Sequence, residues 1–106
     1  MSSRLIQLQQ YVNEDPADPF NLYALALEYQ KTDEPKAMDI FNRLCQEHAE
    51  YVPTYYQLGK LYQALAKNEM ALQVFERGIE MAGKQNDLKA LRELKAAKQE
   101  LLFEDQ

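Results

Sequence analysis

The sequence predicts an all-α protein of about six helices, arranged as helical hairpins that stack into a solenoid. Three observations support this fold class. Apolar residues recur at the three- and four-residue spacing of amphipathic helices, and the alternation typical of strands is missing. Only three Gly and four Pro interrupt the 106 residues, which favours long helices joined by short turns. The middle of the chain repeats with a period of 33 to 34 residues, the length of a helix–turn–helix repeat.

An N-terminal helix is expected over residues 3–14. Ser2 or Ser3 can cap its first turn, since a serine oxygen accepts hydrogen bonds from the unpaired amides there. Its apolar face consists of Leu5, Leu8 and Val12. A segment rich in Asp and Pro ends this helix, and Asp18 followed by Pro19 predicts the start of the next one.

A first helix pair, repeat 1, is expected over residues 19–51. The apolar face of its first helix is Leu22, Leu25, Ala26 and Tyr29. A turn follows, in which Thr32 or Asp33 can cap the second helix. The apolar face of that second helix is Ala37, Ile40, Phe41 and Leu44.

A second pair, repeat 2, is expected over residues 52–85, and a C-terminal capping helix over residues 86–104. Pro53 opens the first helix of repeat 2, whose apolar face is Tyr55, Leu58, Gly59 and Tyr62. The second helix carries Ala71, Leu72, Val74, Phe75 and Ile79, and Gly83 is expected to close it in a left-handed conformation. Asn86 or Asp87 caps the last helix, whose apolar face is Leu88, Leu91, Leu94 and Leu101.

The two helix pairs can be superposed on each other residue by residue. The first helices align at a shift of 33 residues and the second helices at a shift of 34, so the turn of repeat 1 is one residue shorter. The matched positions are Leu22/Tyr55, Leu25/Leu58, Ala26/Gly59, Tyr29/Tyr62, Ala37/Ala71 and Phe41/Phe75.

At these positions the chain resembles the tetratricopeptide-repeat family, as a small member with two repeats and a capping helix on each side. The family pattern of an aromatic residue, Leu-Gly, Tyr, Ala, Phe and a small residue matches Tyr55, Leu58, Gly59, Tyr62, Ala71, Phe75 and Gly78. Repeat 1 departs from the pattern by using Ala26 in place of Gly. The resemblance implies a helical-hairpin solenoid that acts as an adaptor or scaffold by binding other proteins.

Packing within such a solenoid requires small residues where helices cross. Gly59 and Ala26 are expected to let the two helices of a pair approach closely, with Tyr62 and Phe75 filling the space beside them. Each pair then leaves an apolar face that only a neighbouring pair covers. The first and last helices are therefore expected to cap the two ends.

Composition excludes several classes of protein. The net charge of −5 disfavours binding of nucleic acid, whose affinity depends on neutralised phosphates. No apolar run approaches the length of a membrane span, and the first residues do not resemble a signal peptide, so we expect a cytoplasmic protein without membrane contact. The lone Cys45 and the lone His48 cannot form a zinc cage, and no phosphate-binding glycine motif occurs. We expect no metal and no cofactor.

Enzymatic activity is also not expected. Cys45 and His48 lie three residues apart on one helix, a spacing at which side chains meet. No oxyanion donor and no third orienting group accompany them, so we interpret the pair as a buried cysteine and a solvent-facing histidine. No residue is assigned a catalytic role.

The predicted partner-binding residues flank the apolar faces of the two first helices. They are Phe20, Tyr23, Leu27 and Gln30 in repeat 1 and Tyr56, Lys60 and Gln63 in repeat 2. Stacked repeats place such residues on a concave face, so we expect a groove with two stacked tyrosines that holds a peptide or helix of another protein. Some family members grip a carboxylate with Lys and Asn at these faces, and those residues are mostly missing here.

Two alternatives remain for this groove. The last helix of the chain could cover its aromatic residues, or a second copy could do so. In the latter case the protein is a structural, self-associating unit that forms a homodimer through the groove or through an open end of the solenoid. The basic stretch 84–98 is interpreted mainly as a solvated helix face, although it could contact an acidic peptide.

Overall fold

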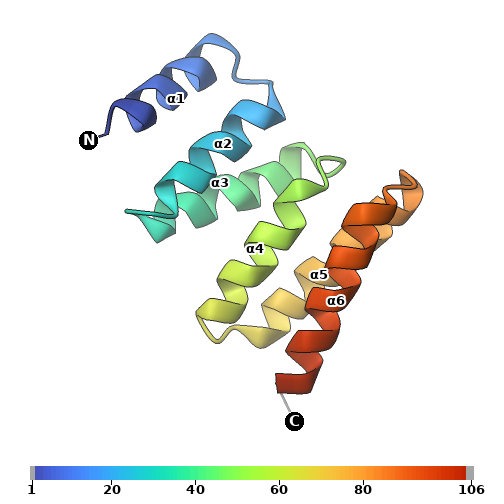
Figure 1. Ribbon diagram of the computed structural model, residues 1–106. Coiled ribbons are helices and arrows are strands. Elements are labelled where there is room, and N and C mark those ends of the chain that lie inside the picture. Colours follow the sequence, from blue (N-terminus) through green and yellow to red (C-terminus); the bar gives the residue numbers. More distant parts are fainter. Residues whose placement is uncertain (1, 105–106) are drawn as a thin grey trace. The chain divides into compact units, whose positions relative to one another are not determined.

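The structure is a computed structural model that describes residues 2–104 (Figure 1). Residues 2–104 contain six helices and no strand, as α1 (Ser3–Glu14), α2 (Pro19–Tyr29), α3 (Glu34–Glu47), α4 (Pro53–Ala64), α5 (Asn68–Lys84) and α6 (Leu88–Glu104). Helices that follow each other in the chain pack as hairpins within two compact units, residues 1–51 and residues 52–106. The predicted all-α fold of sequential helical hairpins is confirmed. The assignment of residues to repeats and caps stays a prediction.

Side-chain caps fix the starts of four helices. Ser2 Oγ accepts a hydrogen bond from the Leu5 amide at 3.0 Å, and Asp18 Oδ1 accepts one from the Phe20 amide at 2.9 Å. Asp33 and Asp87 cap α3 and α6 in the same way, at 3.2 Å and 3.1 Å. Each cap satisfies an amide that has no partner within its helix. The sequence therefore predicted the helix starts from local chemistry.

The first unit has a core formed by α1, α2 and α3, in which α2 contacts both of the other helices. Leu5 and Leu8 of α1 are buried, as are the predicted apolar residues Leu22, Leu25, Ala26 and Tyr29 of α2 and Ala37, Phe41 and Leu44 of α3. The Tyr29 hydroxyl accepts a hydrogen bond from Gln9 Nε2 at 2.7 Å, which ties α2 to α1. Val12 and Ile40, also predicted in the core, are only half-buried.

The second unit packs α5 between α4 and α6, and α6 also contacts α4. Its largest buried side chains are aromatic: Tyr55 and Phe75 are fully buried and Tyr62 nearly so. A Cβ atom at Gly59 would overlap the ring of Phe75, and one at Gly78 would lie 2.5 Å from Cβ of Tyr55. Both glycines are therefore required by close packing, and for Gly59 the prediction is confirmed.

Two predictions about the second unit are wrong. Gly83 does not close α5 in a left-handed conformation, because α5 continues to Lys84 and the residue with positive φ is Asn86, at 56°. Asparagine tolerates that conformation better than most residues, and the Asp87 amide then donates to the Ala82 carbonyl at 3.0 Å, which satisfies the helix end. Leu88 does not join the core of α6 but is 67% exposed.

Candidate interaction surface

The predicted site residues of the first unit lie along α2 and just beyond its end. Phe20, in the first turn, is 61% exposed, whereas Tyr23 and Leu27 are half-buried. Gln30 is half-buried at the C-cap of α2. Their spacing keeps them beside the buried face of α2, so the helix presents an aromatic and apolar edge next to its core.

Tyr23 is the centre of an aromatic cluster that sequence analysis did not identify in full. Its ring lies edge-on to Phe41 at 6.2 Å and to Tyr51 at 5.5 Å between centroids. Such edge-to-face pairs contribute beyond their buried area. Tyr51 follows the end of α3, outside any helical period, so no spacing pattern pointed to it. Tyr23 therefore holds the end of repeat 1 in place as well as lining the surface.

The electrostatic setting of Tyr51 reflects this cluster. Burial is the largest cause that raises the pKa of Tyr51 above its ordinary value, followed by the charges of Tyr23 and Asp18. A tyrosine with a raised pKa stays neutral at physiological pH. Its hydroxyl then remains able to donate a hydrogen bond at this edge of the first unit.

The predicted site residues of the second unit lie along α4. Tyr56, Lys60 and Gln63 are all half-buried, and their four- and three-residue spacing places them on one side of the helix. Gln63 Nε2 donates a hydrogen bond to Glu104 Oε2 of α6 at 2.8 Å. The Oε1 atom of Gln63 is buried without a partner among the described residues. Because it is buried, this oxygen is closed to a donor from a binding partner.

Each of the two residue sets thus lies within its own unit. The α2 set belongs to the first unit and the α4 set to the second. Their joining into one groove stays a prediction.

Comparison with solved structures identifies the family. Two structures of a tetratricopeptide repeat domain protein from Salinibacter ruber are 41% and 42% identical to this chain. The crystal structure matches 79% of this chain and 96% of its own, with a TM-score of 0.76. The solution structure matches 82% of this chain and 89% of its own, with a TM-score of 0.78. This chain belongs to the tetratricopeptide-repeat family.

More distant structures show the same tetratricopeptide-repeat fold. A solution structure of a protein from Bordetella parapertussis is 20% identical, covers 99% of this chain and 92% of its own, and has a TM-score of 0.82. A crystal structure of MamA is 23% identical, covers 92% of this chain and 56% of its own, and has a TM-score of 0.66. At these identities the likeness concerns the fold alone. No protein-family model and no curated protein matches the chain.

Tetratricopeptide-repeat domains generally serve protein–protein interaction and are typically non-catalytic. Of the two residues considered as a catalytic thiol and imidazole, Cys45 is buried, and His48 Nδ1 lies 3.7 Å from Glu50 Oε1. His48 forms the C-cap of α3, where its backbone amide donates to the Leu44 carbonyl at 2.7 Å. Cys45 is therefore part of the packed interior, and His48 ends helix α3, so both residues have structural positions.

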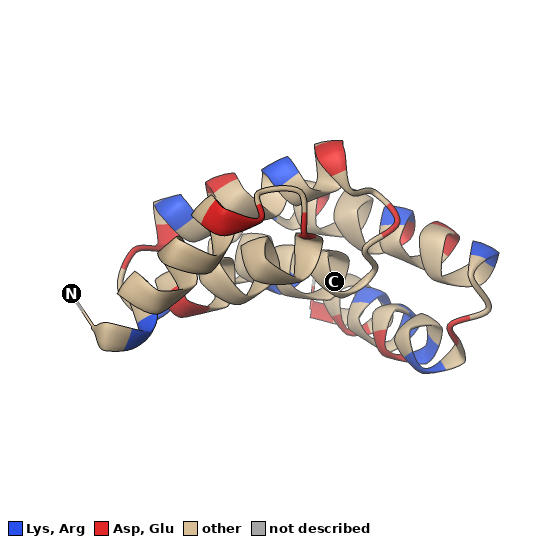
Figure 2. Ribbon diagram, turned by 90° about the horizontal axis from the view of Figure 1, so that it is seen from above, with Lys and Arg blue, Asp and Glu red and all other residues tan. Residues whose placement is uncertain are grey.

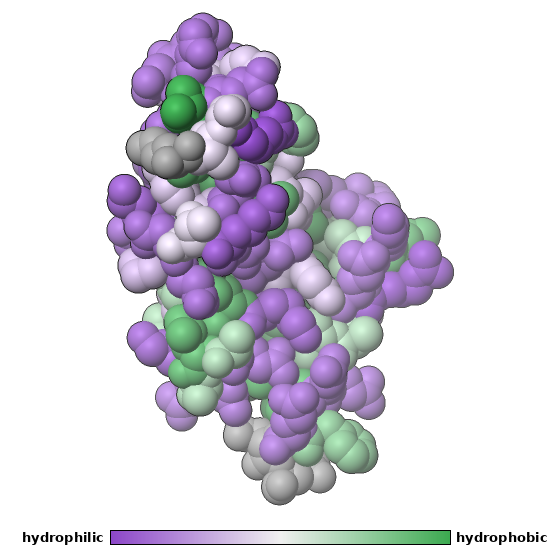
Figure 3. All heavy atoms as spheres, turned by 60° about the vertical axis from the view of Figure 1, so that its left-hand side comes forward, coloured by the Kyte–Doolittle hydropathy of each residue, from purple (hydrophilic) through white to green (hydrophobic). Residues whose placement is uncertain are grey.

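The face of this tetratricopeptide-repeat chain shown in Figure 3 is mostly hydrophilic, with hydrophobic residues gathered in small patches. Basic and acidic residues are both spread over the helices (Figure 2). Within residues 2–104, no helix is long and apolar enough to cross a membrane. In the same part of the chain, no three His, Cys, Asp or Glu side chains gather as metal ligands would.

Proposed function

We propose that this chain binds a peptide or helical segment of another protein through the exposed sides of α2 and α4. The family membership supports an interaction role. The observation that carries the proposal is Phe20, which is 61% exposed although the core of α2 is complete without it. A large aromatic residue without a packing role in its own fold is typical of a binding anchor.

The chemistry of the two residue sets suits an amphipathic segment. Phe20, Tyr23 and Leu27 offer apolar and aromatic area on α2, and Tyr56 repeats the position of Tyr23 on α4. Lys60 adds a positive charge, and the half-buried Gln63 lies on the same side of α4. Aromatic anchors provide affinity, and a few polar groups beside them fix the orientation of the bound partner.

The test is selection of short peptides from a displayed random library, followed by affinity measurement on variants. Tyr23→Ala is unsuitable by itself, because it would break the cluster with Phe41 and Tyr51. We therefore combine Phe20→Ser with Tyr56→Ala, and use Ile6→Ser as the control, since Ile6 is 53% exposed on α1, outside both residue sets. Selected peptides should bind the double variant at least about tenfold more weakly and the control unchanged.

Equal affinity of the double variant and the wild type would overturn the proposal. The alternative, a homodimer, is distinguished by light scattering over a concentration series. A doubling of mass in the wild type that disappears in the Phe20→Ser, Tyr56→Ala variant would assign these residues to a second copy of the chain and would also overturn it.

A further inference from the structure

Helix α6 carries a second apolar row that its own core does not use. The core side of α6 is Leu94, Ala97 and Leu101, all buried. Leu88 and Leu102 lie on an adjoining side and are 67% and 43% exposed. They are fourteen residues apart with Lys95 midway, and a seven-residue spacing keeps side chains on one side of a helix. Such a row is typical of a helix that contacts a further helix.

A shallow groove between α5 and α6 borders the Leu102 end of this row. It has a volume of about 390 Å³ and is lined by Ile79 of α5 and by Lys95, Lys98, Gln99 and Leu102 of α6. Lys98 Nζ lies 3.5 Å from Glu76 Oε2, so the two helices face each other across the groove. The lining residues of α6 span two turns, about 10 Å, which matches a short helical contact.

Gly83 borders the same side of α5, one turn beyond Ile79. Nothing lies within 4 Å of the position that its Cβ would occupy. At Gly59 and Gly78, by contrast, neighbouring side chains leave no room for a Cβ atom. Its φ is not positive, so the backbone does not require glycine either. A glycine within a helix costs stability relative to alanine. The open space beside Gly83 allows the backbone of a second helix to approach closely.

The charges around the groove favour an acidic occupant. Lys95 is exposed in the groove, and Arg92 lies one turn before it on the same side of α6. The carboxylates nearest on α5 already face lysines: Glu76 faces Lys98, and Glu80 lies 3.4 Å from Lys84. The helical period places the acidic residues of α6, Glu93, Glu100 and Glu104, on the other side. The groove therefore combines the apolar Ile79 and Leu102 with the exposed positive charge of Lys95.

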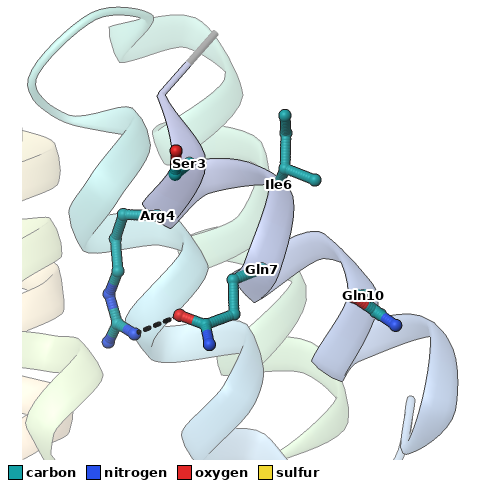
Figure 4. A pocket seen from close by; sticks show the side chains of 5 residues that line it. All are labelled: Ser3, Arg4, Ile6, Gln7 and Gln10. Carbon is teal, nitrogen blue, oxygen red and sulfur yellow. Dashed lines mark hydrogen bonds between the residues drawn. The ribbon is translucent and has the colours of Figure 1, made fainter.

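We propose that the α5–α6 groove binds an acidic amphipathic helix of another protein. Its leucines would pack on Ile79, Leu88 and Leu102, and its carboxylates would pair with Lys95 and Arg92. The exposed side of α1 of a second copy of the chain is a poorer fit. The exposed side of α1, with Ile6 at 53% exposure, offers Ser3, Arg4, Gln7 and Gln10, of which Arg4 and Gln7 are hydrogen-bonded at 3.2 Å (Figure 4). It brings a cation and amides, but no carboxylate.

The experiment uses the full chain and a labelled synthetic peptide of about four helical turns. The peptide has a leucine stripe at three- and four-residue spacing, with Glu on both flanks. A second peptide replaces every Glu with Lys. Fluorescence polarisation measures the two dissociation constants. The acidic peptide should bind and the basic peptide should bind at least about tenfold more weakly.

Two variants and a matched control locate the binding. Lys95→Glu should weaken binding of the acidic peptide about tenfold, because it reverses a charge in the groove. Lys89→Glu makes the same change of charge on an exposed residue outside the groove lining and should leave binding nearly unchanged. Gly83→Leu fills the open space and should also weaken binding about tenfold. If Gly83→Leu lowers helicity by circular dichroism, Leu102→Ser replaces it.

Three results would overturn the proposal. They are equal affinity for the acidic and basic peptides, equal effects of Lys95→Glu and Lys89→Glu, and a wild-type dimer in light scattering that Lys95→Glu dissociates. The last would show that a second copy covers the groove. The Phe20→Ser, Tyr56→Ala variant should bind the acidic peptide like the wild type, so this proposal and the proposed function fail or succeed separately.

Discussion

Replacing two glycines by alanine in the second unit should change stability in opposite directions. Gly59→Ala places a Cβ within 3.0 Å of three ring carbons of Phe75, whose side chain is fully buried and has no exposed side to move into. Overpacking of this kind lowers the free energy of unfolding by about 1–3 kcal/mol. The better helix propensity of alanine offsets up to about 1 kcal/mol of this loss. A net loss of about 1–2 kcal/mol in the free energy of unfolding is expected.

Gly83→Ala is the matched control for this change. The new Cβ contacts nothing within 4 Å, so only the helix propensity remains and the free energy of unfolding should rise. The gain is at most about 1 kcal/mol, since Gly83 lies in the last turn of α5. The two variants should therefore differ by about 2 kcal/mol, or about 10 °C in Tm. Urea denaturation and thermal melting followed by far-UV circular dichroism measure both.

A Gly59→Ala protein as stable as Gly83→Ala would refute the close approach of α4 and α5. A second measurement isolates the cause. Phe75→Leu removes ring atoms from the space that the new Cβ at position 59 would need, so the double variant should be more stable than the sum of the two single changes predicts. Additive losses would show that the cost of Gly59→Ala arises elsewhere.

Two further predictions concern the turn after α4 and the aromatic cluster of the first unit. Ala66 has a φ of 60°, so Ala66→Gly should raise the free energy of unfolding by about 1 kcal/mol in urea denaturation, and a loss would contradict the strain at this position. The pKa of Tyr51 lies above 10.0 in the folded protein, so its contribution to stability is complete below pH 10 and is lost as the pH rises through the folded-state pKa. Melting temperatures of the wild type should therefore fall more steeply above pH 10 than those of Tyr51→Phe, and parallel curves would contradict the raised pKa.

The fold could be predicted because its determinants are local or periodic. Asp18 and Asp33 cap helices through their nearest amides, and those bonds need only a few residues of sequence. The alignment of Phe41 with Phe75 at one repeat length identified two fully buried residues in equivalent places. Gly59 was informative because a repeat requires a small residue at each crossing of its helices.

The site was harder to predict, because its residues follow no single period. Tyr51 lies after the C-cap of α3, so only the folded chain brings it to Tyr23. The sequence also gives no means of separating the anchoring role of Tyr23 from its binding role, since an aromatic ring beside a helix face serves both. Exposure separates them for Phe20, which has no packing role in α2.

The two wrong predictions have different causes. Gly83 was assigned to the end of α5, but Asn86 takes the left-handed conformation there. Leu88 was assigned to the core of α6 because it continues the apolar period, although it is 67% exposed. A hydrophobic period records which sides of a helix meet other helices, but it does not record whether those helices belong to the same chain. Leu88 is exposed and Gly83 has open space beside it, although neither residue lines the α5–α6 groove itself. Under the proposal above, a residue such as Leu88, which fits the packing pattern and is exposed, would contact a helix of another protein.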